Sequence, residues 1–172
     1  MATKRKIDAF DYAGQICKAF KPYGVLLTTA AEGKVNTMTI GWGTIGIDWS
    51  RPVFIAFVRE SRYTKEMLDK NPEFTVNIPM GPADRHILGF CGTKSGRDTD
   101  KFGSLGLTAV ESDVVSVPGI AQLPLTLECK VLYKEEQDLS RIPGDIIDRY
   151  YPQGDHHHVY YGEIVNAYII EE

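Results

Sequence analysis

The apolar positions along the chain predict mostly β-strands, with a few helices between them. Between residues 7 and 20 the apolar side chains recur every three or four positions, which is typical of an amphipathic helix, and Pro22 and Gly24 end it. The remaining apolar runs are short and bounded by Gly, Pro, Asn or Asp, as strands joined by turns are. These runs predict strands at residues 25–30, 35–41, 52–58, 73–78, 107–110, 123–133 and 157–170.

The connections between the predicted strands include helices, tight turns and one long loop. Ser61 can cap a helix that runs to about Lys70, and Asp84 can cap a second, shorter one. Residues 142–151 predict a third helix. Residues 91–105 predict a long polar loop, and a loop of this length in a compact domain is either disordered or functional. Tight turns are predicted at residues 32–34 and 48–52.

The order of these elements predicts a mainly β fold. Strands outnumber helices and do not alternate regularly with them, which argues against a doubly wound parallel sheet. No GxGxxG segment lies between a strand and a helix, so no Rossmann-type nucleotide site is indicated. We predict one domain over residues 1–172, a mostly antiparallel barrel with a few flanking helices. The N-terminal helical region, residues 1–22, is expected to pack on the barrel.

Composition narrows the class of partner. The net charge of −4 argues against nucleic acid or an anionic membrane as the main partner. The one basic run, residues 4–6, is interpreted as a solvated tail. No apolar stretch approaches the roughly 18 residues that a membrane span needs, and the first ten residues lack the apolar core of a signal peptide. A cytoplasmic protein is therefore expected.

The cysteines and histidines predict no metal site. Cys17, Cys91 and Cys129 are widely spaced, which suggests neither a disulfide framework nor a CxxC site and fits reduced thiols. Residues 156–158 are three consecutive histidines, but neighbours on a strand point to opposite faces. No carboxylate or Cys at a suitable spacing accompanies them, so one inward-pointing histidine beside a cofactor is the better interpretation.

Polar residues on a predicted strand form the first candidate site. Asn36, Thr37 and Thr39 accompany Met38 there, and inward-facing polar groups would need partners that a ligand rich in carbonyls and ring nitrogens could supply. A strand with one solvent face is the commoner explanation. Trp42 lies between two glycines, where an aromatic ring could stack on a planar ligand, although a core position is also compatible with the pattern.

Residues 61–64 form the second candidate site, at the start of a helix. Free amides at a helix N-terminus favour a phosphate, Ser61 and Thr64 add hydroxyls, and Arg62 adds a planar fork suited to phosphate oxygens. Taken alone, a plain helix cap with a solvated Arg62 is favoured over a phosphate site. Residues 94–101 add three cations among small residues, and they fit an anion-closing loop and an exposed mobile loop about equally well.

Taken together, these segments resemble a known family. The order and spacing of the matching residues hold from about residue 25 to residue 165, and no single motif is diagnostic. The chain resembles the flavin reductase-like proteins of the FMN-binding split-barrel fold, an antiparallel Greek-key type, and within them the flavoredoxin branch. The resemblance rests on residues 33–34, 36–42, 51–52, 61–64, 91–92, 95–98, 100–102, 157 and 162–163.

The resemblance implies a homodimer that binds one FMN per subunit without a covalent bond, near the subunit interface. Asn36, Thr39 and Trp42 would contact the isoalloxazine ring, and Ser61 and Thr64 would hold the phosphate with the help of Lys101. His157 would lie close to the flavin, and the Cys91 thiol could touch it. The cofactor-binding residues expected in this way are Asn36, Thr37, Met38, Thr39, Trp42, Ser61, Arg62, Thr64, Cys91, Gly92, Lys101 and His157.

The resemblance further implies an FMN-dependent oxidoreductase. Electrons would pass from a reduced nicotinamide or a redox protein, through the flavin, to an acceptor. Residues 41–44 replace a Ser-rich segment of simpler flavin reductases, which favours the flavoredoxin branch over turnover of free flavin. Two alternatives stay open, a non-enzymatic FMN electron carrier and a binding module for another ligand.

Overall fold

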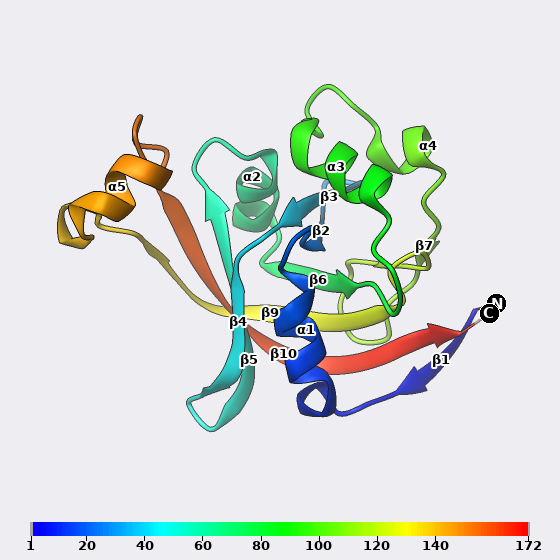
Figure 1. Cartoon of the computed structure of the whole chain (residues 1–172). Coiled ribbons are helices and arrows are strands. Elements are labelled where there is room, and N and C mark those ends of the chain that lie inside the picture. Colours follow the sequence, from blue (N-terminus) through cyan, green and yellow to red (C-terminus); the bar gives the residue numbers. More distant parts are fainter. Residues whose placement is uncertain (1, 172) are drawn as a thin grey trace.

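The computed structural model describes residues 2–171, and its centre is one antiparallel sheet of eight strands (Figure 1). Seven of the strands follow the order β3-β2-β6-β9-β10-β5-β4, and the eighth, β1, pairs with β10. A separate two-stranded sheet joins β7 and β8. The strands are β1 (Thr3–Lys6), β2 (Val25–Ala31), β3 (Lys34–Ile40), β4 (Gly43–Asp48), β5 (Arg51–Arg59), β6 (Glu73–Ile78), β7 (Ala109–Val110), β8 (Gly119–Ile120), β9 (Leu125–Glu136) and β10 (His157–Glu171).

Two tight hairpins form the ends of the sheet. β2 and β3 are joined through Glu32 and Gly33, and β4 and β5 through Trp49 and Ser50. All four turn residues have positive φ, between 50° and 76°. Two-residue turns of this kind match the right-handed twist of the paired strands, which explains why three non-glycine residues accept the left-handed conformation. The turn predicted at residues 48–52 is thus shorter than expected, since Arg51 already pairs within β5.

Strand β10 connects the parts of the sheet. Its first half pairs with β5 from His157 to Glu163, and its last residues pair with β1. Along most of its length it also pairs with β9, with register shifts at Tyr161/Gly162 and Ile164/Asn166. At the first shift, a side chain on Gly162 would collide with the ring of Phe74, so the bend there depends on glycine.

The helices lie at different sides of the sheet. α2 packs on β2, α3 packs on β3, and α1 contacts β4, while α5 projects at the end of the sheet away from α3 and α4 (Figure 1). No helix within residues 2–171 has the length and apolarity to cross a membrane. The helices are α1 (Ala13–Ala19), α2 (Tyr63–Lys70), α3 (Arg85–Thr93), α4 (Lys101–Leu105) and α5 (Gly144–Tyr150), with short 3-10 turns at Ala9–Tyr12 and Leu139–Arg141.

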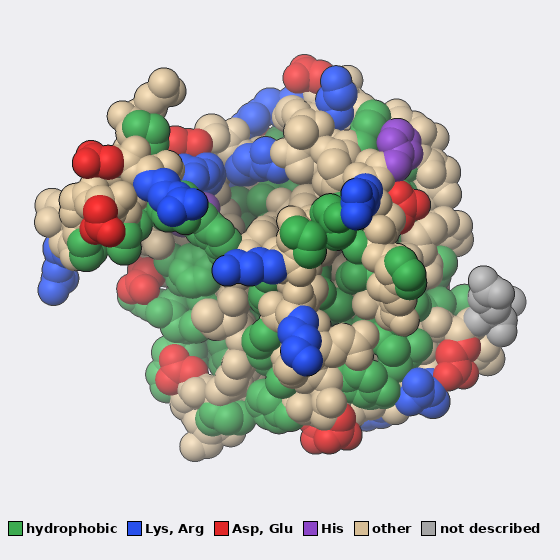
Figure 2. Space-filling view, in the orientation of Figure 1, with side chains coloured by type: hydrophobic (Ala, Val, Ile, Leu, Met, Phe, Trp, Pro, Cys, Tyr) green, Lys and Arg blue, Asp and Glu red, His purple; other side chains and the backbone are tan. Residues whose placement is uncertain are grey.

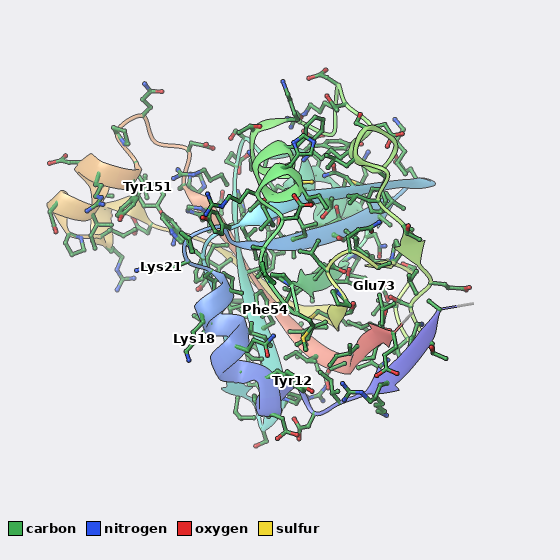
Figure 3. All side chains as sticks on the ribbon, turned by 45° about the vertical axis from the view of Figure 1, so that its right-hand side comes forward. Tyr12, Lys18, Lys21, Phe54, Glu73 and Tyr151 are labelled. Carbon is green, nitrogen blue, oxygen red and sulfur yellow. The ribbon has the colours of Figure 1, made fainter. Side chains whose placement is uncertain are left out.

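Two apolar clusters hold these layers together. The larger one fills the interior of the sheet around Phe54 and Phe74, both fully buried, and receives Ile16 from α1. Figure 3 shows Phe54 beside α1, within the body of the molecule, and Tyr151 at the base of the α5 projection. The smaller cluster lies under α3 and α4 and includes Leu88 and Leu107. Burial of these side chains fixes the two helices above β3.

The prediction of a mainly β, antiparallel fold with a few flanking helices is confirmed, and four local predictions are wrong. Residues 4–6 are no solvated tail, because they form β1 on β10. The helix expected from residue 7 begins as a 3-10 turn at Ala9, after Asp8 accepts a bond from the Phe10 amide. The loop predicted at residues 91–105 is helical at both ends, since α4 is capped by Asp100 and ended by Gly106 at φ 63°. Ser61 does not cap α2, whose N-cap residue is Arg62.

Candidate flavin-binding site

Two adjoining cavities lie between the open end of the sheet and helices α2 and α3. The first measures about 230 Å³ and the second about 160 Å³. Met38 of β3 and Arg62 at the start of α2 line both, so the cavities form one groove with two chambers. Their combined size reaches the lower end of the roughly 300–1,000 Å³ that small-molecule sites occupy.

The first chamber has aromatic walls. The rings of Trp42 and His157 lie 5.0 Å apart, and Tyr150 meets Trp42 edge-on at 5.1 Å. Phe57 and Arg59 from β5 line the chamber as well. Trp42 is 41% exposed although it is the largest of these side chains, so part of its ring is available to a planar ligand.

His157 is held as a neutral ring. Its Nδ1 lies 2.7 Å from the Tyr151 hydroxyl, which itself donates to Oε1 of Gln137 at 2.9 Å. Since the tyrosine proton is used in that bond, Nδ1 carries the hydrogen and Nε2 keeps its lone pair. Burial, together with the nearby charge of Arg59, lowers the pKa of His157 to about 4. At neutral pH the ring therefore offers an acceptor to the chamber.

Arg62 lies at the junction of the two chambers. Its guanidinium donates to the Gly92 carbonyl oxygen at 3.3 and 3.4 Å and pairs with no carboxylate within residues 2–171. Partial burial lowers the pKa of Arg62 from its ordinary value. The backbone of Arg62 begins α2, and no side chain caps that helix end. Free amides and a half-buried cation thus meet at one point, which favours an anion.

Lys101 is a second cation with the same lack of an acidic partner. Its side chain is 3% exposed, and its Nζ donates to the carbonyl oxygens of Thr37 at 2.7 Å and Cys91 at 3.1 Å. Burial lowers the pKa of Lys101 to about 8. Burial also raises the pKa of the Cys91 thiol to about 11, so that residue stays protonated at neutral pH. A buried lysine without a carboxylate gains most from an anionic ligand.

The second chamber is closed by the loop between α3 and α4. Arg97 pairs with Glu66 of α2, donates to the Ser61 carbonyl oxygen at 3.1 Å and lies over the ring of Tyr63. Gly96 passes so close to Asn36 that a side chain there would overlap it. The loop is therefore built into the wall of the chamber, beside the first turn of α2.

Ser61 already binds an anion, which belongs to the protein itself. Its amide donates to Oδ1 of Asp155 at 2.9 Å, and its hydroxyl donates to Oδ2 at 2.7 Å. Asp155 has a φ of 53° and follows Gly154, so a strained turn presents its carboxylate. The arrangement shows that the Ser61 amide and hydroxyl suit two oxygens of one anionic group.

The donors of the groove fit FMN better than a neutral ligand. Lys and Arg side chains gather around the hollow between the α5 projection and the α2–α3 side (Figure 2). An aromatic chamber leads directly into a chamber with cations, hydroxyls and a helix N-terminus, as a planar ring with a phosphate tail requires. Gly41 lines the ring chamber, and no atom lies within 4 Å of the position that a Cβ would take there. At Gly43, by contrast, the rings of Phe20 and Phe54 already fill that position.

The structure brings most of the predicted site residues together. Thr37 is turned away, since its hydroxyl bonds to Thr28 and to the Leu27 carbonyl oxygen. Cys91 is fully buried, and neither chamber is lined by it. Thr39 lines the ring chamber, but its hydroxyl donates to Leu88 of α3 at 2.6 Å. The residues that line one or both chambers are Asn36, Met38, Thr39, Trp42, Ser61, Arg62, Thr64, Gly92, Lys101 and His157.

Several residues in the groove or next to it escaped the sequence analysis. Phe57 and Arg59 alternate on β5, and period-two spacing beyond the apolar run could have pointed to them. Asp155 and the Tyr151–Gln137 pair had no such signal, because they approach the groove from the irregular segment around α5.

Comparison with known proteins gives a consistent picture. A family model described as flavin reductase like domain matches residues 20–172. An uncharacterized protein of Archaeoglobus fulgidus is 31% identical over 127 residues, which cover 73% of this chain and 71% of that protein. Flavoredoxin from Methanosarcina acetivorans is similar at a TM-score of 0.65 and 27% identity, covering 87% of this chain and 69% of that one. Flavoredoxin of Desulfovibrio vulgaris (Miyazaki F) has a TM-score of 0.67 at 24% identity, covering 87% and 70%.

Proposed function

The chain belongs to the flavin reductase-like family, and from this premise we propose that it is an FMN-binding oxidoreductase of the flavoredoxin type. It would pass electrons from a reduced nicotinamide or a redox protein to an acceptor. One observation carries the choice of FMN: Arg62 and Lys101 line the second chamber with only carbonyl partners among residues 2–171. We extend the proposal to a homodimer, as the resemblance to the flavoredoxin branch implies, and to the cytoplasmic location expected from the sequence.

Each chamber would hold one part of the cofactor. Trp42 and His157 would flank the ring, with Nε2 of His157 accepting a hydrogen bond from a ring N–H group. The first turn of α2, with Thr64 and Ser61, would hold the phosphate, and Arg62 would reach both parts. Asp155 must leave the Ser61 amide when a phosphate binds there, since two anions cannot share one donor pair.

Bound FMN would supply the redox chemistry, and the side chains would bind and orient it. The Arg62 guanidinium near the ring would stabilise negative charge that develops there. The aromatic walls would exclude water from one side of the ring. The buried ammonium of Lys101 would neutralise charge on the phosphate from the protein side of the chamber.

A comparison of FMN with riboflavin tests the phosphate assignment. The purified protein is titrated with each ligand while flavin fluorescence is followed. We expect FMN to bind at least tenfold more tightly than riboflavin, since each charge-assisted hydrogen bond to the phosphate is worth about 1.5–3 kcal/mol. Arg62→Gln should weaken the binding of both flavins, and that of FMN more strongly, because Arg62 lines both chambers. Equal affinity for the two flavins would contradict a phosphate site, and no binding of either would reject the flavin proposal.

An anaerobic experiment separates an enzyme from a carrier. The FMN-loaded protein is mixed with NADH or NADPH in the absence of oxygen, and the loss of yellow colour is followed. If the protein is an oxidoreductase that uses a nicotinamide, its flavin should be reduced at the rate of a typical enzyme turnover, about 1 s⁻¹ or faster. A protein that bleaches only with a reduced redox protein would be an electron carrier instead.

A further inference from the structure

Four metal-binding side chains meet where strands β5, β9 and β10 lie side by side. Glu60 directly follows β5, Glu136 ends β9, and His156 and His158 lie at the start of β10. Backbone pairing holds them in place, since His158 is opposite Glu136 in the register and the Glu60 amide donates to the His156 carbonyl oxygen at 3.0 Å. The cluster belongs to neither chamber of the groove.

We propose that this cluster is a binding site for a divalent transition-metal ion of the zinc class. Its four potential ligand atoms all lie within 4.8 Å of one another. Nε2 of His156 and Nε2 of His158 lie 3.1 and 3.4 Å from the same oxygen of Glu136, and Nε2 of His158 also contacts Glu60. A tetrahedral Zn²⁺ with bonds of about 2.0–2.1 Å holds neighbouring ligand atoms about 3.3 Å apart. The two distances to Glu136 therefore match those between neighbouring ligands of a tetrahedral site.

Burial and charge support an ion at this place. The His158 side chain is 4% exposed, whereas Glu60 and Glu136 are 48% and 63% exposed, so the site has a buried floor and an opening to solvent. Two carboxylates and two imidazoles would neutralise a dication. Lys65 lies 3.8 Å from the other oxygen of Glu60, and Glu136 forms no salt bridge with a lysine or arginine among the described residues.

The ligand types select the metal class. Two imidazole nitrogens with two carboxylate oxygens suit Zn²⁺ and its neighbours Co²⁺, Ni²⁺ and Cu²⁺, whereas an all-oxygen site would be needed for Ca²⁺ or Mg²⁺. The alternation of residues 156–158 places His157 in the ring chamber and its two neighbours on the opposite face. The sequence shows no carboxylate at a suitable spacing from these histidines, and the fold brings Glu60 and Glu136 to them from positions distant in the chain.

Zinc binding by the flavin-free protein tests the proposal independently of the proposed function. The untagged full chain is freed of metal by dialysis against a chelator and titrated with ZnCl₂ in a calorimeter. We expect one Zn²⁺ per chain. Glu136→Gln and His156→Gln, both at partly exposed positions, should each weaken binding about 100-fold, because even the loss of an outer-shell partner costs 10–100-fold. The matched controls Glu135→Gln and His86→Gln should bind as the unaltered chain does.

Two further measurements guard against a false result. Circular dichroism of the metal-free variants should show unchanged melting, so that weaker binding reflects a lost ligand rather than lost structure. Co²⁺ added in place of Zn²⁺ should give the visible absorption of a four-coordinate ion, and Glu136→Gln should remove it. Absence of stoichiometric Zn²⁺ binding, or equal binding by both ligand variants and their controls, would overturn the proposal and leave an ion-pair cluster.

Discussion

Two buried charged side chains, Glu128 and Lys101, differ in how fully the protein satisfies their hydrogen-bonding capacity. Glu128 is fully buried on β9, and its carboxylate accepts hydrogen bonds from the amides of Asp113, Val114 and Val115 and from Asn166, at 2.7–3.2 Å. Lys101 is almost as buried, yet its ammonium has only two carbonyl oxygens for partners. The loop before β8 supplies the amides that bind Glu128, whereas Lys101 lines the second chamber of the groove.

The difference separates a structural charge from a binding charge. A buried ion whose hydrogen-bonding capacity is filled from within fixes the surrounding chain, and removing it leaves several donors unpaired. A buried ion that is only partly paired costs stability in the free protein and regains it when a ligand of opposite charge arrives. The four predictions that follow test this division, beginning with the largest expected effect.

Replacing Glu128 should chiefly affect folding. Glu128→Ala leaves three backbone amides without an acceptor, and we expect the free energy of unfolding to fall by about 3 kcal/mol. Denaturant unfolding measures the loss, with the exposed Glu111→Ala as the matched control. Folded Glu128→Ala protein should still bind FMN normally. A loss below about 1 kcal/mol would mean that the carboxylate does not organise this loop.

Replacing Lys101 should have the reverse profile. Lys101→Met should weaken FMN binding by about 2 kcal/mol, or about 30-fold, and should not lower the free energy of unfolding, since it removes a partly paired buried charge. Riboflavin binding should stay the same, because it lacks the phosphate. Lys94→Met, which removes an exposed lysine from the same chamber, should have a much smaller effect. If both variants bind FMN alike, burial does not set the strength of the contact.

The pH dependence of Lys101 sharpens the same point. With a pKa of about 8 in the free protein, Lys101 loses its proton as pH rises from 7.5 to 9, and FMN affinity should fall about tenfold over that range. Stability should change in the opposite direction, because between pH 8 and the ordinary lysine value of 10.5 the unfolded chain holds a proton that the folded protein lacks. Both slopes should disappear in Lys101→Met, as fluorescence titration and denaturant unfolding across this range would reveal.

The smallest effect concerns the anion that already occupies Ser61. Asp155→Asn keeps the shape of the side chain and suits the positive φ at this position, but it removes a negative charge from the proposed phosphate site. We expect FMN affinity to increase about threefold, with riboflavin unchanged, since competition for the Ser61 donors is weakened. Unchanged or weaker FMN binding would place the phosphate away from Ser61.

The fold was predictable wherever local pattern determines structure. Strands β2, β3, β5 and β6 were predicted within a few residues, since their apolar runs are bounded by turn residues. β1 was missed because its polar side chains stay largely exposed and only its backbone pairs with β10, at the other end of the chain. α4 was missed because its five residues depend on the Asp100 and Gly106 caps rather than on apolar spacing.

The site was predictable in parts but not as an assembly. The polar positions of β3 and the start of α2 were recognised, and the resemblance joined them, but periodicity could not show that Met38 and Arg62 line both chambers. Asp155, Glu60 and Glu136 depend on strand register and on chain reversals far from their partners. Such contacts are set by the pairing of distant segments, which one sequence does not encode in a visible pattern.

The pairing of β10 with β5 also decides which length changes this protein can tolerate. The two strands pair without a register shift from His157 to Glu163, and this fixes the phase in which His157 faces the ring chamber while His156 and His158 face the other way. Deleting one residue between positions 158 and 161 would exchange the two faces, whereas deleting two would restore the alternation. Among natural or engineered variants, this segment should therefore lengthen or shorten in steps of two.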